Sequence, residues 1–144
     1  MAEDTMRKLG PVTLEHSPII LNQTASVAEA CNRMRDGRAG SVLVTDNSGM
    51  LVGIFTGRDA VCRVLAHGRE AATTPLADVM TANPTSMSPD QTTVDALRLM
   101  RDGGFRHLPL VRNHRIVGLL SRSDYHDVGQ RSHEEERDPW EHWR

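Results

Sequence analysis

The sequence has little cysteine, few aromatic residues and no long apolar run. Only 2 of its 144 residues are cysteine, and Cys31 and Cys62 form neither a CxxC pair nor a metal-ligand spacing. We therefore interpret both as small core residues of a protein in a reducing compartment. No apolar run approaches the roughly 20 residues that a membrane helix needs. Residues 1–4 are acidic and lack the apolar segment of a secretory signal, so we expect a cytoplasmic protein with no membrane partner.

An excess of charge of one sign is also missing, with 17 Lys and Arg against 19 Asp and Glu. A balanced chain has no general electrostatic attraction for nucleic acid, so we expect no nucleic-acid partner. Trp140 and Trp143 lie in a polar C-terminal stretch, which leaves Phe55, Phe105 and Tyr125 for the body of the chain. The core must then be aliphatic, and a bound base would rest on backbone and aliphatic side chains more than on aromatic rings.

Signatures of catalysis and of metal binding are absent from the sequence as well. The seven histidines show no HExxH motif and no close pairing with cysteine, so we expect no metal site. The chain has no nucleophile elbow, no P-loop and no dinucleotide-binding GxGxxG. We therefore expect that the protein is not an enzyme and requires no cofactor.

What the sequence does have is an internal repeat. Pro18 pairs with Pro84, 66 positions later, and the same offset relates many residues of the following helices. One residue is then lost at a turn, and residues 53–59 pair with 118–124, 65 positions later. One copy alone cannot bury its apolar face, whereas two packed copies can. Equivalent residues are then expected twice around a pseudo-twofold axis.

Each copy is predicted to fold as β-α-β-β-α, with helices facing a sheet. Capping boxes at Ser26 and Thr92 begin the first helix of each copy, and Gly37 and Gly103 end these helices. The predicted strands are 18–21, 41–45, 50–55, 85–87, 107–111 and 116–120, and further helices are expected at 58–66, 75–80 and from 123. The predicted fold class is therefore α/β (α+β), with the two copies packed as a pseudo-twofold pair.

The same patterns predict the domain boundaries. We expect a lead-in at 1–16, the first copy at 17–70, a linker with a short helix at 71–83, the second copy at 84–129 and a flexible tail at 130–144. The tail is charged, poor in apolar residues and interrupted by Pro139.

The candidate functional residues lie in two equivalent motifs. Residues 53–59 read GIFTGRD and residues 118–124 read GLLSRSD, so each copy has a glycine, two apolar strand residues, a hydroxyl and a carboxylate at a helix start. Ser/Thr-x-x-Asp is a plain capping box, and that structural explanation is one alternative. The other is a ligand site, because a helix N-terminus attracts phosphate and a carboxylate accepts hydrogen bonds from a ribose diol. The two explanations are compatible.

These motifs, with the A-x-x-x-M-R-x-x-G helix and the strand at Pro109–Val111, make the chain resemble the cystathionine β-synthase (CBS) domain family in its paired form, the Bateman module. The resemblance covers residues 11–130. It implies a central cleft that binds adenine nucleotides, AMP, ADP, ATP or NAD(H), and many members form homodimers. The ribose and phosphate roles then fall on Asp59 with Thr56, and on Asp124 with Ser121. The strand openings that would line the base pocket are Ser17, Pro18 and Ile19, and Asn83, Pro84 and Thr85.

The two copies differ at the site. The second has Arg106 and His107 where the first has Gly40 and Ser41, and Pro109 replaces Leu43. The resemblance implies that such a basic pair reaches ligand phosphates, so the first site is expected to be weaker, differently selective or empty.

Two more arginines are candidates. Arg58 and Arg122 occupy different positions in their motifs and do not align. Each either binds a phosphate group of the ligand or is a solvated surface arginine.

The motifs and the resemblance together predict a non-enzymatic regulatory module that binds an adenine nucleotide. Such a module is expected to sense energy or redox state and to act through an unknown effector protein. We expect a homodimer, with Val61, Val64 and Leu65 on an apolar helix face. One alternative is a structural or dimerisation module without a physiological nucleotide. A small hydrolase is the least favoured alternative, because no acid/base pair with a nucleophile is visible.

Overall fold

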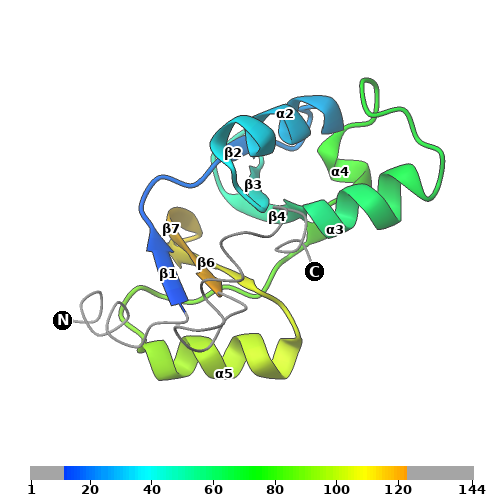
Figure 1. Ribbon diagram of the computed structural model, residues 1–144. Coiled ribbons are helices and arrows are strands. Elements are labelled where there is room, and N and C mark those ends of the chain that lie inside the picture. The colour runs from blue at the N-terminus through cyan, green and yellow to red at the C-terminus, as the bar shows by residue number, and fades with distance from the viewer. Residues whose placement is uncertain (1–11, 123–144) are drawn as a thin grey trace. The chain divides into compact units, whose positions relative to one another are not determined.

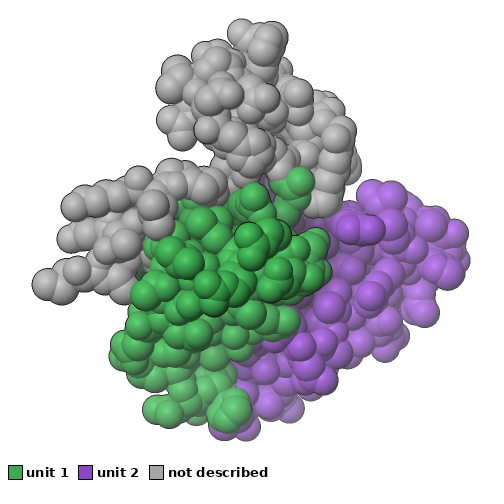
Figure 2. All heavy atoms as spheres, turned by 90° about the horizontal axis from the view of Figure 1, so that it is seen from below, with its two compact units in different colours: residues 1–17, 85–138 green, residues 18–84, 139–144 purple. Residues whose placement is uncertain are grey.

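The computed structural model describes residues 12–122, and these residues divide into two compact units. We call residues 18–84 the repeat-A unit, purple in Figure 2, and residues 12–17 with 85–122 the repeat-B unit, green in Figure 2. The α+β class is confirmed, since a small sheet combines with several helices in the repeat-A unit and with helix α5 (Thr93–Gly103) in the repeat-B unit (Figure 1). The expected last helix and the tail lie outside the described residues.

The repeat-A unit is built on a four-stranded sheet in the order β2-β3-β4-β5. Strand β2 is parallel to β3, and the other two pairings are antiparallel. The strands are β2 (Ile20–Asn22), β3 (Ser41–Thr45), β4 (Leu51–Thr56) and β5 (Thr81–Ala82), and the helices are α2 (Val27–Gly37), α3 (Gly57–Asp59), the π-helix η1 (Ala60–Leu65) and α4 (Leu76–Val79). The β-α-β-β-α order expected for the first copy is therefore present.

Helix α2 shows why this copy folds as the sequence predicts. The Ser26 side chain accepts a hydrogen bond from the Glu29 amide, and Val27, Ala30 and Met34 form the buried stripe. They pack with residues of the sheet and of the later helices, among them Phe55, which is fully buried. The helix ends at Gly37 as expected, but the residue that takes the left-handed conformation and closes it is Arg38, at φ 52°, and not the glycine.

The repeat-B unit is built on a three-stranded antiparallel sheet in the order β1-β7-β6. Its elements are β1 (Val12–Glu15), α5 (Thr93–Gly103), β6 (His107–Arg112) and β7 (Arg115–Arg122). Helix α5 begins with the complete capping box predicted at Thr92 and covers one face of the sheet, where Ala96 and Met100 meet Leu108 and Leu120 (Figure 1).

In each sheet, one edge strand comes from the segment that precedes the other copy in the sequence. Strand β1 precedes the first copy but pairs with β7 of the second, and β5 precedes the second copy but pairs with β4 of the first. Residues expected as a lead-in thus contain a strand. Residues expected as a linker contain β5 and, in α4, Leu76 and Val79, which lie in the repeat-A core.

The strand expected at 85–87 is reduced to a single bridge between Met87 and Leu110. In the repeat-A unit, the equivalent parallel pairing begins with a hydrogen bond from the Leu43 amide to the Ile19 carbonyl, 2.9 Å long. Pro109 replaces Leu43 and has no amide hydrogen to donate, so the second copy cannot form that bond.

Two burial predictions are wrong. Cys62 is exposed and Cys31 only half-buried, so they are not two core residues. Val64 is 2% exposed and lies in the repeat-A core, whereas Val61 and Leu65 are 44% and 71% exposed. The cause is the π-helix, in which the Ala66 amide bonds to the Val61 carbonyl five residues back. This wider turn changes the α-helical spacing on which the prediction of one shared face depended.

No helix within residues 12–122 is both long and apolar enough to cross a membrane.

Candidate ligand-binding site

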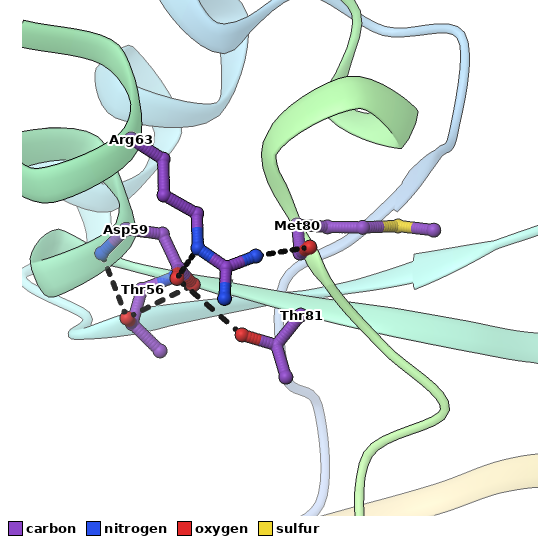
Figure 3. A network of polar contacts seen from close by, with 5 residues as sticks. All are labelled: Thr56, Asp59, Arg63, Met80 and Thr81. Atoms are coloured by element: carbon purple, nitrogen blue, oxygen red, sulfur yellow. Dashed lines mark hydrogen bonds and ion pairs between the residues drawn. The ribbon is translucent and has the colours of Figure 1, made fainter. Parts of the chain in front are cut away.

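The first motif places a buried carboxylate at the start of a helix. Strand β4 ends at Thr56, α3 begins at Gly57, and Asp59 is 7% exposed. The Thr56 amide and hydroxyl both donate to Asp59 Oδ2, over 3.0 and 3.2 Å, and the Asp59 amide donates to Thr56 Oγ1 over 3.3 Å (Figure 3). The two candidate residues therefore lie together as a complete capping box.

The other carboxylate oxygen of Asp59 contacts residues that the sequence did not indicate. Arg63 Nε lies 3.5 Å from Oδ1, and the Thr81 hydroxyl donates to Oδ1 over 3.4 Å. The Arg63 guanidinium also donates to the Met80 carbonyl, over 2.8 Å (Figure 3). Helix η1 and strand β5 thus meet at Asp59.

The glycine that opens the motif allows this close approach. A Cβ atom on Gly53 would collide with the Met80 side chain, including its sulfur. In the repeat-B unit, a Cβ atom on Gly118 would lie 3.1 Å from the Glu15 carbonyl oxygen. Both motif glycines therefore make room for the strand that comes from before the other copy.

The second motif is described only as far as Arg122. Ser121 lies on β7 directly between Thr13 of β1 and His107 of β6, so the three side chains share one face of the sheet. The Arg122 amide donates to the Arg106 carbonyl over 2.8 Å. The structure thus brings together Ser121, His107 and the backbone of Arg106, while Asp124 lies outside the described residues.

His107 is the most strongly shifted titratable group among the described residues. Desolvation, together with the positive charge of Arg106, lowers the pKa of His107 to about 4. The imidazole is therefore neutral at physiological pH, and it can act beside Ser121 as a hydrogen-bond donor or acceptor. In the repeat-A unit the residue paired with Thr56 is Ser41, which is buried and carries no charge at any pH.

Of the remaining predicted residues, Arg58 lies on α3, and the others lie where the chain passes between the two units. Arg58 is exposed beside Asp59, on the short helix α3. Ser17 is exposed, while Pro18 and Ile19 are half-buried, and the chain passes from one unit to the other between Ser17 and Pro18.

The second passage between the units lies between Pro84 and Thr85. Asn83 and Thr85 are exposed, and Pro84 is half-buried. Asn83 has φ 50°, and its amide donates to the Val52 carbonyl over 3.0 Å.

Arg63 and Thr81 are the site residues that sequence reasoning missed. Arg63 follows Asp59 by four residues, a spacing at which opposite charges on a helix pair, so the signal was present. Thr81 had no local signal, because it reaches Asp59 only through the pairing of β5 with β4. Among the described residues, no group of three or more His, Cys, Asp or Glu side chains could hold a metal ion.

Comparison with known proteins gives a consistent result. The family model of the CBS domain matches residues 5–65 and 76–128. The CBS domain-containing protein CBSCBSPB2 of Arabidopsis thaliana is 40% identical over 102 residues, which are 71% of this chain but only 19% of that protein. The chain thus spans about a fifth of that relative. The CBS domain-containing protein YhcV of Bacillus subtilis is 32% identical over 123 residues, covering 85% of this chain and 84% of that protein.

A solved structure extends the comparison to the fold. The CBS domain pair of protein MJ0100, in complex with 5'-methylthioadenosine and S-adenosyl-L-methionine, superposes with a TM-score of 0.66 at 24% identity. The superposition covers 75% of this chain and 87% of that one.

Proposed function

The chain belongs to the CBS domain family, and we propose that it is a non-enzymatic regulatory module whose two repeats bind an adenine nucleotide. The observation that carries this proposal is the buried Asp59 carboxylate beside the Thr56 hydroxyl at a helix start, in a motif whose strand, glycine and hydroxyl recur at residues 118–121. A carboxylate of this kind can accept hydrogen bonds from a ribose diol, and exposed Arg58 is available to a phosphate.

One further observation supports an adenosine ligand, and another bears on how its base would be held. A solved pair of the same fold holds adenosine compounds, so the fold can accommodate them. The described residues also contain a single aromatic side chain in each unit, Phe55 and Phe105. Phe55 is fully buried in its core and Phe105 packs against the other core, so within residues 12–122 a base would rest mainly on backbone and aliphatic groups.

A direct test is thermal unfolding with AMP, ADP, ATP and NADH. A ligand that binds only the folded chain adds about 2.7 kcal/mol of stability at a concentration 100 times its dissociation constant. We expect at least one of these nucleotides to raise the melting temperature in a concentration-dependent way, whereas GTP at the same concentration serves as the control. Product analysis of the same mixtures should show no turnover of the nucleotide.

A structural or dimerisation module is the second candidate, and one observation favours it. Every oxygen of the Asp59 carboxylate already has partners within the repeat-A unit. The melting temperature of such a module should not change on addition of any of the four nucleotides. This result would distinguish it from the nucleotide-binding module.

The partner expected in either case is a second copy of the chain, joined through η1. Val61 and Leu65 are exposed on this helix, and the substitution Leu65→Glu should convert the dimer into a monomer in light scattering. Met50→Glu is the matched control, because Met50 is 37% exposed but lies beside the β3–β4 turn, away from η1. We propose that an effector protein reads the state of the module.

A further inference from the structure

We propose that Thr81 and Arg63 form a latch on Asp59, so that a nucleotide can use this carboxylate only by releasing the segment Met80–Ala82. The proposal rests on the nucleotide-binding function proposed above and concerns the regulation of the same site. All of its residues lie in the repeat-A unit.

The contacts of Asp59 show which oxygen a ligand can take. A carboxylate has about four lone-pair positions, and here four donor atoms of the chain surround it. Oδ2 accepts from the amide and the hydroxyl of Thr56 at 3.0 and 3.2 Å, within the helix cap. Within residues 12–122, the contacts of Oδ1 are the two longer ones, to the Thr81 hydroxyl at 3.4 Å and to Arg63 Nε at 3.5 Å. Oδ1 is therefore the oxygen that can change partners without breaking the cap.

The two residues on Oδ1 hold the incoming strand in place. Arg63 also donates to the Met80 carbonyl over 2.8 Å, and the Met80 side chain lies against Gly53. Strand β5 itself has only two paired residues, with Thr81 opposite Ile54 and Ala82 opposite Gly53. A strand this short and this exposed has few contacts of its own that keep it paired with β4.

The sequence of the second repeat lacks the two side chains of the latch at the equivalent positions. Strands β5 and β1 pair with equivalent positions, Ile54 facing Thr81 and Leu119 facing Glu15, so Glu15 is the counterpart of Thr81. An ionised glutamate has no proton to donate to a carboxylate. The 65-residue offset that relates the two motifs pairs Arg63 with Val128, whose side chain has no hydrogen-bond donor either.

The consequence is a coupling between ligand and strand. A ribose diol at Oδ1 competes with Thr81 and Arg63, so its apparent affinity is reduced by the population of the latched state. Removing the Thr81 hydroxyl should therefore tighten binding at this site by about two- to tenfold, the range expected for one competing hydrogen bond.

The test compares Thr81→Val, which keeps the shape of the side chain, with Thr81→Ser, which keeps the hydroxyl and is the matched control. Without ligand, hydrogen–deuterium exchange at residues 80–83 should be faster in Thr81→Val than in the wild type, and Thr81→Ser should exchange like the wild type. Calorimetry with AMP and with ATP, in an Asp124→Ala background that isolates the first motif, should show tighter binding for Thr81→Val only. Added AMP should accelerate exchange at 80–83 in the wild type.

Equal exchange in the wild type, Thr81→Val and Thr81→Ser would overturn the latch, and so would protection of residues 80–83 by bound AMP. If neither nucleotide binds any variant, the proposed function fails, and the exchange rates without ligand still decide whether Thr81 holds the strand.

Discussion

The two repeats share a backbone and differ in the side chains that the backbone brings together. In the repeat-A unit the motif hydroxyl of Thr56 faces Ser41, whereas in the repeat-B unit Ser121 faces His107. The comparison shows that a duplicated scaffold keeps its helix caps, motif glycines and strand order while its site-facing positions diverge. Two equivalent motifs therefore do not imply two equivalent sites.

The two hydrophobic cores also differ at one equivalent position, the first residue of the first helix in each repeat. Val27 and Thr93 are equivalent first residues of α2 and α5, and both are essentially fully buried. The Thr93 hydroxyl has no hydrogen-bond partner among the described residues, whereas Val27 has no polar atom to satisfy. Burial of an unpaired hydroxyl costs free energy, so Thr93 stabilises α5 less than a valine at the same position would.

The largest expected effect concerns His107 and pH. The unfolded chain binds a proton on this imidazole below its ordinary pKa of 6.5, whereas the folded chain does so only below about 4. The stabilisation from keeping His107 neutral is therefore complete above pH 6.5 and is lost as the pH falls from 6.5 to 4.

The substitution that removes this difference between the repeats is His107→Ser, which installs the residue of the first copy. Relative to this variant, the wild type should lose about 2 kcal/mol of unfolding free energy between pH 7.5 and pH 5. Urea unfolding at the two pH values measures it. Parallel pH profiles of the two proteins would mean that solvent reaches the imidazole freely.

The next effect concerns the two motif carboxylates. Asp124→Ala should weaken adenine-nucleotide binding more than tenfold in calorimetry, a prediction that follows from the GLLSRSD sequence. Asp59→Ala should weaken binding at the first motif and also lower the free energy of unfolding by about 1 kcal/mol, because it removes the carboxylate that accepts from the Thr56 amide in the capping box. Unchanged affinity in Asp124→Ala, with a lower melting temperature, would mean that this carboxylate is only a cap.

The smallest effect comes from exchanging the core residues. Thr93→Val should raise the free energy of unfolding by about 1 kcal/mol, because it removes an unpaired buried hydroxyl without changing the shape of the side chain. Val27→Thr should lower it by a similar amount. Both changes are measured by urea titration, and a loss of stability in Thr93→Val would show that the hydroxyl is satisfied in solution.

Local patterns in the sequence were sufficient to predict the hairpins, the capped helices and the family. The turn at Asn113 and His114 is an example, since both residues have positive φ, at 54° and 67°. Features that depend on distant pairing were not predictable in this way. Strand β1 pairs with β7, which lies at the opposite end of the described residues, and Thr81 reaches Asp59 only because β5 pairs with β4.

The part of the candidate site that depends on local sequence was predicted, and the part that depends on distant strand pairing was not. Thr56 and Asp59 are three residues apart, so the local sequence is enough to predict their contact. The structure confirms this capping box. The burial of Val64 depends on a π-helix, whose occurrence has no simple pattern of residue types. The ligand roles of the site residues remain predictions.

Calorimetric titration of the wild-type chain with AMP and with ATP tests the central claim most directly. If the repeats share a scaffold but differ in their sites, at least one nucleotide should bind either with two distinct affinities or with one molecule per chain. Two identical, independent sites would contradict the role assigned to His107, Arg106 and Thr81, and no binding of either nucleotide would contradict the proposed function itself.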